Sequence, residues 1–291
     1  MKSGFVSIVG RPNSGKSTLL NHLVGEKVSI VTDKPQTTRH VVRGIVTRPE
    51  GQIVFLDTPG VHKPVYRMNE RMMKSVRESV ADVDLTLLIV DASVRFGRGD
   101  DFTLQLLKSV TKKKLLLLNK IDLIEKKNLL PLIDRYSKVG NFEEIIPISA
   151  LTGENVENLM AQVMKFLPEG PMFYPAEQIS DQPERSIAAE MIREKLILLT
   201  EEELPYSTAV VIDRFEEDEK LHRIYASIFV ERDSQKAIVI GKAGQKLKQV
   251  GTDARKELEA FFGRKIYLEL HVKVKKHWRN DEETLKGLGL G

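Results

Sequence analysis

Near the start of the chain, residues 10–17 read Gly10-Arg11-Pro12-Asn13-Ser14-Gly15-Lys16-Ser17. It fits the phosphate-loop pattern G-x-x-x-x-G-K-[ST] and stands between an apolar run, residues 5–9, and a helical pattern, residues 17–24. Glycines allow the loop N–H groups to point at phosphate oxygens, and the helix N-terminus adds positive potential. We therefore expect Lys16 to contact the β- and γ-phosphates of a nucleotide, Ser17 to ligate Mg²⁺, and Thr18 to complete the binding segment.

Strand and helix patterns alternate over the first 167 residues. The expected strands cover 5–9, 41–46, 53–56, 85–90, 115–118 and 145–148, and the expected helices cover 17–24, 68–80, 100–110, 129–136 and 156–167. Residues 49–51 read as a hairpin turn between the second and third strands. This alternation predicts an α/β domain with a mostly parallel sheet covered on both faces.

Three further motifs follow the ends of expected strands. Asp57-Thr58-Pro59-Gly60 places a carboxylate that can hold Mg²⁺ through water and a glycine amide that can sense the γ-phosphate. In Asn119-Lys120-Ile121-Asp122, the Asp122 carboxylate can accept from guanine N1–H and the 2-amino group, which adenine lacks, so ATP is rejected. Lys120 can lay its stem over the base, and Asn119 can tie this loop to the phosphate loop. Ser149-Ala150 can offer a backbone N–H to guanine O6.

With these four motifs in this order, the chain resembles the translation-factor-like GTPases. The resemblance makes residues 36–39 the first switch and implies that Thr38 completes the Mg²⁺ shell when GTP is bound. It also gives Lys16, Thr38 and Gly60 the catalytic roles. Relatives that orient water with a glutamine carry it where Val61 stands here, and an aliphatic side chain cannot do so. Asn13 matches the asparagine that helps bind K⁺ in potassium-activated relatives, so K⁺ is our hypothesis for the missing transition-state charge.

A second domain follows a segment rich in Pro and Gly. We expect a GTP-binding domain over 1–167, a linker over 168–183 and a second domain over 184–291. In the second domain we expect a helix over 186–199, followed by strands over 209–215 and 224–231. A short helical segment that starts at 237 then leads into the turn 241–244. A helical stretch to 262, which Gly251 can interrupt, and a strand over 266–275 complete the order. This order predicts a small α+β domain.

The turn Gly241-Lys242-Ala243-Gly244 gives this second domain its expected function. The order of elements around this G-x-x-G turn is the type-II KH arrangement, in which the loop clamps single-stranded RNA. Small glycines allow phosphates to approach, and lysines neutralise them. The predicted RNA-binding residues are Gly241, Lys242, Ala243, Gly244, Lys246, Lys273, Lys275 and Lys276. Trp278 is either a stacking surface for a base or a packed core residue.

The charge of the C-terminal part supports RNA binding, and the composition of the chain excludes other classes of protein. From Arg232 to Arg279 the chain carries 13 Lys and Arg against 5 Asp and Glu, and a basic patch is typical of proteins that bind phosphate backbones. The chain has no cysteine, which excludes a disulfide framework, and no apolar run long enough to span a bilayer. We expect a cytoplasmic monomer.

The chain resembles the bacterial Era GTPases over nearly its whole length. The residues that carry this resemblance are Asp57-Thr58-Pro59-Gly60-Val61-His62-Lys63-Pro64, the KH pattern, and Val272-Lys273-Val274-Lys275-Lys276-His277-Trp278-Arg279. The resemblance implies binding of GTP and GDP, recognition of the 3′ end of small-subunit ribosomal RNA, maturation of the small subunit within a pre-30S particle, and peripheral contact with the inner membrane face.

Two other classes of function remain open. A metabolic phosphotransferase would also carry a phosphate loop, although the guanine-selecting Asp122 argues against it. In a membrane-associated signalling switch, the basic C-terminal region would bind anionic lipid instead of RNA. The G-x-x-G context favours RNA.

Overall fold

The computed structural model describes residues 1–218 and 220–290. Glu219 and Gly291, which fall in the predicted second domain, lie outside the described residues. The chain divides into two compact units. The first contains Met1–Pro64 and Met72–Asp181, and the second contains Val65–Arg71 and the residues from Gln182 onward. Each unit is described by itself.

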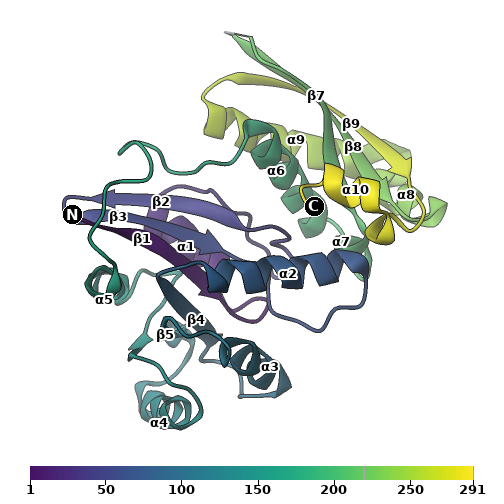
Figure 1. Ribbon diagram of the computed structural model, residues 1–291. Helices are drawn as coiled ribbons and strands as arrows, with labels where there is room; N and C mark the ends of the chain where they lie inside the picture. The colour runs from purple at the N-terminus through teal and green to yellow at the C-terminus, as the bar shows by residue number, and fades with distance from the viewer. Residues whose placement is uncertain (219, 291) are drawn as a thin grey trace. The chain divides into compact units, whose positions relative to one another are not determined.

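The first unit is built around a six-stranded sheet in the order β2-β3-β1-β4-β5-β6 (Figure 1). Its strands are β1 (Lys2–Val9), β2 (Val42–Arg48), β3 (Gly51–Asp57), β4 (Leu85–Asp91), β5 (Lys113–Asn119) and β6 (Glu144–Pro147). Its helices are α1 (Lys16–Val24), α2 (Arg67–Ala81, from Met72 on), α3 (Arg98–Leu107), α4 (Leu129–Val139) and α5 (Val156–Phe166). Only β2 runs antiparallel to its neighbour, since Arg48 and Gly51 close the predicted hairpin.

Alternating apolar side chains bury both faces of this sheet. Leu87 and Ile89 of β4 pack in one core with α1 and α5, whereas Leu88 and Val90 pack in a second core with α2, α3 and α4. Such continuous apolar runs are typical of parallel strands covered on both sides. The predicted α/β fold is therefore confirmed, and the loops at the carboxyl ends of β1, β3, β5 and β6 carry the predicted motifs.

The segment after α5 contacts the first unit up to Asp181. Gln52 on β3 accepts hydrogen bonds from the backbone N–H groups of Phe173 (2.8 Å) and Tyr174 (3.0 Å). Ile45 on β2 donates to the Ile179 carbonyl at 2.9 Å. Much of the stretch that we expect to act as a linker is therefore fastened to the hairpin, while the limits 168–183 remain a prediction.

The second unit has a three-stranded sheet in the order β7-β8-β9, with β8 antiparallel to β7 and parallel to β9 (Figure 1). Its elements are α6 (Glu184–Leu198), α7 (Leu204–Ser207), β7 (Ala209–Glu216), β8 (Leu221–Val230), α8 (Asp233–Ile240), α9 (Gln245–Phe262), β9 (Lys265–Val274) and α10 (Glu282–Gly287). Apolar residues of α6 and α9, such as Ile192 and Leu258, form its core with the strands. This is the predicted KH arrangement.

The structure decides two expectations for this unit. Helix α9 continues through Gly251, so the proposed interruption there is wrong. Val250, Ala254 and Leu258 recur at helical spacing and are fully buried, and this packing outweighs the low helix propensity of one glycine. The structure also resolves the two alternatives for Trp278, because its side chain is completely buried and is a core residue.

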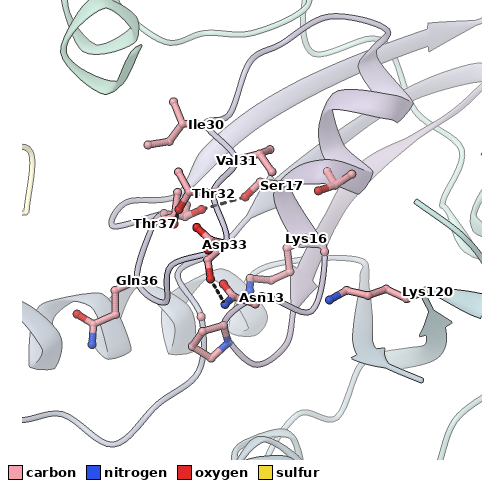
Figure 2. Close-up of a pocket in the computed structure, with 15 residues that line it drawn as sticks. Asn13, Lys16, Ser17, Ile30, Val31, Thr32, Asp33, Gln36, Thr37 and Lys120 are labelled. Atoms are coloured by element: carbon pink, nitrogen blue, oxygen red, sulfur yellow. Dashed lines mark hydrogen bonds between the residues drawn. The ribbon is translucent and has the colours of Figure 1, made fainter. Parts of the chain in front are cut away.

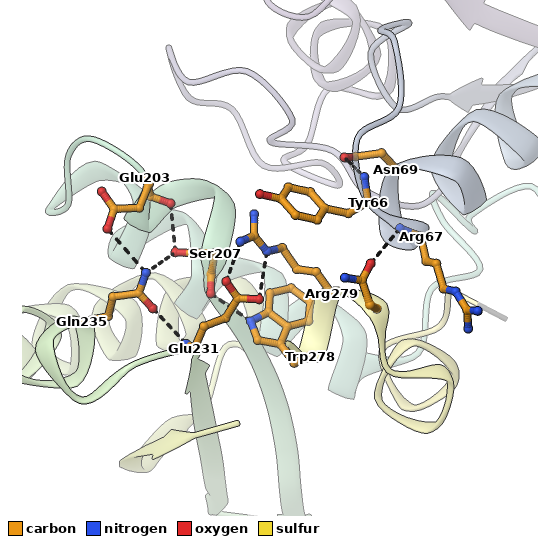
Figure 3. A network of polar contacts seen from close by, with 10 residues as sticks. Tyr66, Arg67, Asn69, Glu203, Ser207, Glu231, Gln235, Trp278 and Arg279 are labelled. Atoms are coloured by element: carbon orange, nitrogen blue, oxygen red, sulfur yellow. Dashed lines mark hydrogen bonds and ion pairs between the residues drawn. The ribbon is translucent and has the colours of Figure 1, made fainter. Parts of the chain in front are cut away.

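Trp278 is part of a polar network that fastens the C-terminal segment to the helices before β7 and after β8 (Figure 3). The indole Nε1 donates to the Ser207 carbonyl at 2.9 Å, and Arg279 forms a 2.5 Å ion pair with Glu231. Gln235 donates to Ser207 Oγ and accepts from the Glu231 backbone N–H. Among residues 1–218 and 220–290, no helix has both the length and the apolar character needed to cross a bilayer.

Candidate nucleotide site and RNA-binding loop

The phosphate loop joins β1 to α1, and its glycines are needed where the backbone turns. Gly15 has φ +98°, a left-handed conformation that side-chain-bearing residues rarely adopt. A Cβ at Gly15 would also clash with the Asn119 side chain, and one at Gly10 would clash with the Ile89 carbonyl. The loop can therefore pass close to the neighbouring strand ends only with glycine at both positions.

Lys16 lies inside this loop with its ammonium facing the loop carbonyls. Its Nζ donates to the Arg11 carbonyl at 2.9 Å and to the Gly10 carbonyl at 3.4 Å. Burial lowers the pKa of Lys16 to about 8, and the nearby Asp57 carboxylate opposes this shift only in part. An anion bound in the loop would therefore meet an ammonium that is shielded from water.

Three predicted metal ligands lie together beside Lys16. Ser17 Oγ is 2.6 Å from Asp57 Oδ2 and 2.9 Å from Thr38 Oγ1. Oxygen ligands of this kind suit Mg²⁺, and the buried Asp57 Oδ1 accepts no hydrogen bond within the described residues, so this set fits the ion. Burial raises the pKa of Asp57, a shift that a bound cation would oppose. Thr37, in contrast, donates to the Lys34 carbonyl at 2.7 Å.

The sequence analysis did not single out Ser29, which also contacts this cluster. Its hydroxyl donates to Asp57 Oδ2 at 2.9 Å, and only 4% of the residue is exposed. Asn21 on α1 holds Ser29 in place by accepting from its N–H at 2.9 Å and donating to its carbonyl at 2.7 Å. Asp57 is therefore connected to the chain just before the first switch.

A pocket of about 190 Å³ opens next to Lys16 (Figure 2). Figure 2 shows residues of the stretch 30–37 on one side of this pocket and Lys120 on the other. The predicted residues that line it are Pro12, Asn13, Gly15, Lys16, Ser17, Thr18, Thr38, Gly60 and Lys120. The pocket thus extends from the expected phosphate-binding residues to Lys120 of the expected base loop.

Asn119 joins the two loops that are expected to bind opposite ends of the nucleotide. Its Nδ2 donates to the Ser14 carbonyl at 2.8 Å, which is the predicted tie to the phosphate loop, and its Oδ1 accepts from the Ala150 N–H at 2.9 Å. Ser149 and Ala150 are buried, whereas Asp122 is exposed on the 3-10 turn Ile121–Leu123. One of the amides of the segment expected to face guanine O6, that of Ala150, is therefore bonded to Asn119 in this structure.

The residues after Asp57 face the interior and the phosphate loop. Thr58 Oγ1 donates to the Ile8 carbonyl at 2.8 Å, and Pro59 is buried. A Cβ at Gly60 would clash with Pro12, so the chain approaches the phosphate loop closely here. Val61 is 2% exposed and packs in the core beside α2. Its side chain is committed to packing, in agreement with the expectation that it does not orient water.

Two polar residues of the phosphate loop have partners outside the loop. Arg11 forms a 2.9 Å ion pair with Asp100 at the start of α3. Asn13 has φ +62°, and its amide donates to the Asp33 carbonyl at 2.6 Å (Figure 2). Asn13 therefore lies against the backbone of the segment that leads into the first switch.

The G-x-x-G turn joins α8 to α9 in the second unit. Gly241, Ala243 and Gly244 have φ values of +73°, +50° and +75°, while Lys242 is exposed and Lys246 is half-buried on the first turn of α9. Lys273 and Lys275 lie at or beyond the end of β9, where they face Asp213 (3.5 Å) and Asp281 (3.4 Å); Lys276 is exposed. The predicted RNA-binding residues thus occupy two parts of this unit.

Comparison with known proteins covers both units. Residues 5–120 match the family described as "50S ribosome-binding GTPase", and residues 203–279 match the family described as "KH domain". The chain is similar to a GTPase Era from Staphylococcus haemolyticus (strain JCSC1435), with 49% identity over 290 residues that cover 99% of this chain and 97% of that protein.

Two solved structures are similar over the full length. One is Era in complex with MgGDPNP and nucleotides 1506–1542 of 16S ribosomal RNA, with a TM-score of 0.95 and 42% identity, covering 100% of this chain and 99% of that one. The other is an Aquifex aeolicus Era variant bound to GDP and AlF4⁻, with a TM-score of 0.95 and 41% identity, covering 100% of both chains.

Proposed function

The chain belongs to the Era family of GTPases and is itself a GTPase, and we propose that it is a switch that binds the 3′ end of small-subunit ribosomal RNA and assists maturation of the small subunit. The observation that carries the switching part is the cluster of Ser17, Thr38 and Asp57. Thr38 belongs to the first switch and the other two to the fixed core of the site. A ligand that holds all three therefore orders the switch segment.

The other residues of the site fit the hydrolysis of GTP. Lys16 neutralises the β- and γ-phosphates, and the Gly60 amide contacts the γ-phosphate. Ser17, Thr38 and Asp57 would hold Mg²⁺, which supplies charge stabilisation to the phosphates. Asp122 and Lys120 select guanine, and the amides of the phosphate loop hold the remaining phosphate oxygens. After hydrolysis Thr38 loses its γ-phosphate-dependent contact, and the first switch is released.

Val61 cannot orient the attacking water. In this proposal, K⁺ supplies the transition-state charge that hydrolysis needs. Asn13 supports the idea because it lines the nucleotide pocket and its amide oxygen is a suitable ligand for a monovalent cation. Replacing KCl with NaCl at equal ionic strength should lower the hydrolysis rate of the wild-type protein but not that of Asn13→Ala. Equal wild-type rates in the two salts would exclude this role for K⁺.

In the second unit, the G-x-x-G turn binds single-stranded ribosomal RNA. Gly244 supports this assignment, because a Cβ there would meet no described atom within 4 Å and the turn therefore leaves room for a phosphate. Lys242 and Lys246 neutralise the RNA backbone, and Lys273, Lys275 and Lys276 extend the basic surface. The protein acts as a monomer in a pre-30S particle, and GTP binding favours the RNA-bound state.

The test is RNA crosslinking and sequencing on the full-length protein loaded with a non-hydrolysable GTP analogue or with GDP. Gly244→Asp should abolish crosslinking and leave GTP binding intact, because the variant adds bulk and negative charge to the turn. Gly263→Asp is a matched control, since Gly263 also has a positive φ of +64° and open space around its Cβ position within the described part of the chain. Both variants carry the same backbone strain, about 1–2 kcal/mol.

Enrichment of one small-subunit segment, stronger with the GTP analogue and lost only in Gly244→Asp, would support the proposal. Equal crosslinking by both variants and the wild type would remove the KH turn from the RNA site. Flotation of the nuclease-treated protein with anionic vesicles, without crosslinked RNA, would replace RNA by lipid as the partner and support peripheral membrane binding.

A further inference from the structure

Asp91, the last residue of β4, lies beside the loop that is expected to bind the base. Strands β4 and β5 are parallel, and their register places Asp91 opposite Asn119. The Asp91 carboxylate Oδ2 is 2.5 Å from Lys120 Nζ, and the side chains are 16% and 31% exposed, respectively. A lysine of the guanine site is thus paired with a carboxylate from the neighbouring strand, largely away from water.

Asp91 is held in place by its own turn. Its Oδ1 accepts from the Ser93 N–H at 2.9 Å and from Ser93 Oγ at 2.6 Å, so the two carboxylate oxygens have different partners. The Ala92 N–H donates to the Asn119 carbonyl at 2.8 Å and fastens the two strand ends to each other. Burial raises the pKa of Asp91, but the hydrogen bonds from Lys120 and Ser93 outweigh it, and the pKa lies below its usual value.

Lys120 is consequently restrained at both ends. Its backbone is left-handed, with φ +65°, and its ammonium is paired with Asp91. The four methylene groups between these ends form the surface that the base would contact. A long side chain that is already ordered loses less conformational entropy when the ligand binds, and this lowers the free energy cost of binding.

We propose that Asp91 is a positioning residue for guanine nucleotides, which fixes the Lys120 stem beside the base by holding the Lys120 ammonium. The inference rests on the proposed role of Lys120 in the GTP site. Asp91 contacts no nucleotide atom in this proposal, so its effect must pass through Lys120 and must disappear when the Lys120 ammonium is removed.

The test is the release rate of fluorescent GDP from full-length protein in a double-mutant cycle. Asp91→Asn should speed release by roughly three- to ten-fold, the effect expected from freeing one long side chain. Lys120→Met keeps a stem of similar length without the ammonium, and Asp91→Asn should cause no further change in that background. Asp134→Asn is the control, because it breaks a 2.6 Å ion pair with Lys138 on α4 that lies in no predicted motif.

A purely structural role for Asp91 would give a different pattern. It would lower the thermal midpoint of the nucleotide-free protein and speed release equally in both backgrounds, and this result would overturn the proposal. So would wild-type release rates in Asp91→Asn. If Lys120→Met alone leaves release unchanged, the role of Lys120 and this inference both fail, while tight GDP binding by the wild-type protein would leave the proposed GTPase function intact.

Discussion

In the proposed GTP site, Asp122 is the single exposed residue that is expected to determine which base is accepted. It stands on the turn Ile121–Leu123, one turn away from the buried Asn119. A guanine base would cover this carboxylate and satisfy it with two N–H donors, whereas adenine would cover it without any donor. A buried polar group without a hydrogen-bond partner costs free energy, and for this reason a hydrogen-bonding site strongly rejects an analogue that lacks the donor.

Asp122→Asn should shift the preference of the site from guanine to xanthine nucleotides. The substitution replaces one of the two carboxylate oxygens, which are acceptors, by an NH₂ donor. GTP affinity should therefore fall by about 100-fold, and the affinity for xanthosine triphosphate should rise. Competition of both nucleotides against fluorescent GDP gives the ratio directly. Unchanged GTP affinity would remove Asp122 from the base site.

Ser29 is a second residue whose effect on nucleotide binding, through the Asp57 carboxylate, can be measured by itself. Ser29→Ala removes one hydroxyl group that donates to Asp57 Oδ2, while that of Ser17 remains. We expect GDP retention to require roughly ten-fold more Mg²⁺, the usual size of an effect that acts through a metal ligand. The measurement is GDP release as a function of Mg²⁺ concentration. Ser79→Ala, another buried serine, should leave this dependence unchanged, and an unshifted curve for Ser29→Ala would contradict the coupling.

Among the elements, the short C-terminal segment contributes more to the second unit than its length suggests. Trp278 is fully buried there, and Arg279 is paired with Glu231 after β8. Segment 275–281 has no long helix or strand of its own, so its order depends on these contacts. Trp278 thereby connects the chain end to α7, which precedes β7.

Trp278→Ala should lower the free energy of unfolding of the second unit by about 3–5 kcal/mol, because it leaves a cavity and an unpaired Ser207 carbonyl. Trp278→Phe retains most of the apolar contact and should cost less. Urea unfolding followed by circular dichroism gives both values, and GTP binding should not change. A loss of less than about 1 kcal/mol for Trp278→Ala would mean that the segment is not anchored by this residue.

The elements also show what can be predicted from sequence. The parallel strands were predictable because apolar runs such as 53–56 and 115–118 end directly before polar motifs. Helices α7 and α10, of 4 and 6 residues, are too short to show a period, and their position depends on contacts with distant residues. Ser29 and Asp91 belong to no motif. They acquire a role only because folding brings Ser29 next to Asp57 and β4 next to β5.

At the scale of the whole molecule, the two units have separate apolar cores. The cores on the two faces of the first sheet contain residues of the first unit, and the third core contains residues 187–272 of the second. Each unit also contains its own candidate site. Ligand binding stabilises only the native structure that forms the site.

Thermal unfolding should therefore show two transitions that respond to different ligands. In the absence of GTP, GDP at 100 times its Kd should stabilise the first unit by about 2.7 kcal/mol and leave the second unchanged. An oligonucleotide from the 3′ end of small-subunit ribosomal RNA, added without nucleotide, should shift only the second. Differential scanning calorimetry with each ligand tests this. A single transition that both ligands raise would show that the units unfold as one.

The side chain of Asn119 has a consequence for accuracy in a cell that contains several nucleoside triphosphates. One amide holds the Ser14 carbonyl of the phosphate loop and the Ala150 amide of the base loop. If the proposed site is coupled through this amide, the coupling is reciprocal, and a base that displaces its loop should also weaken binding of the phosphates. The proposal therefore predicts that an incorrect nucleotide is tested at both ends at once, and that the triphosphate, which ATP shares with GTP, does not suffice for tight binding.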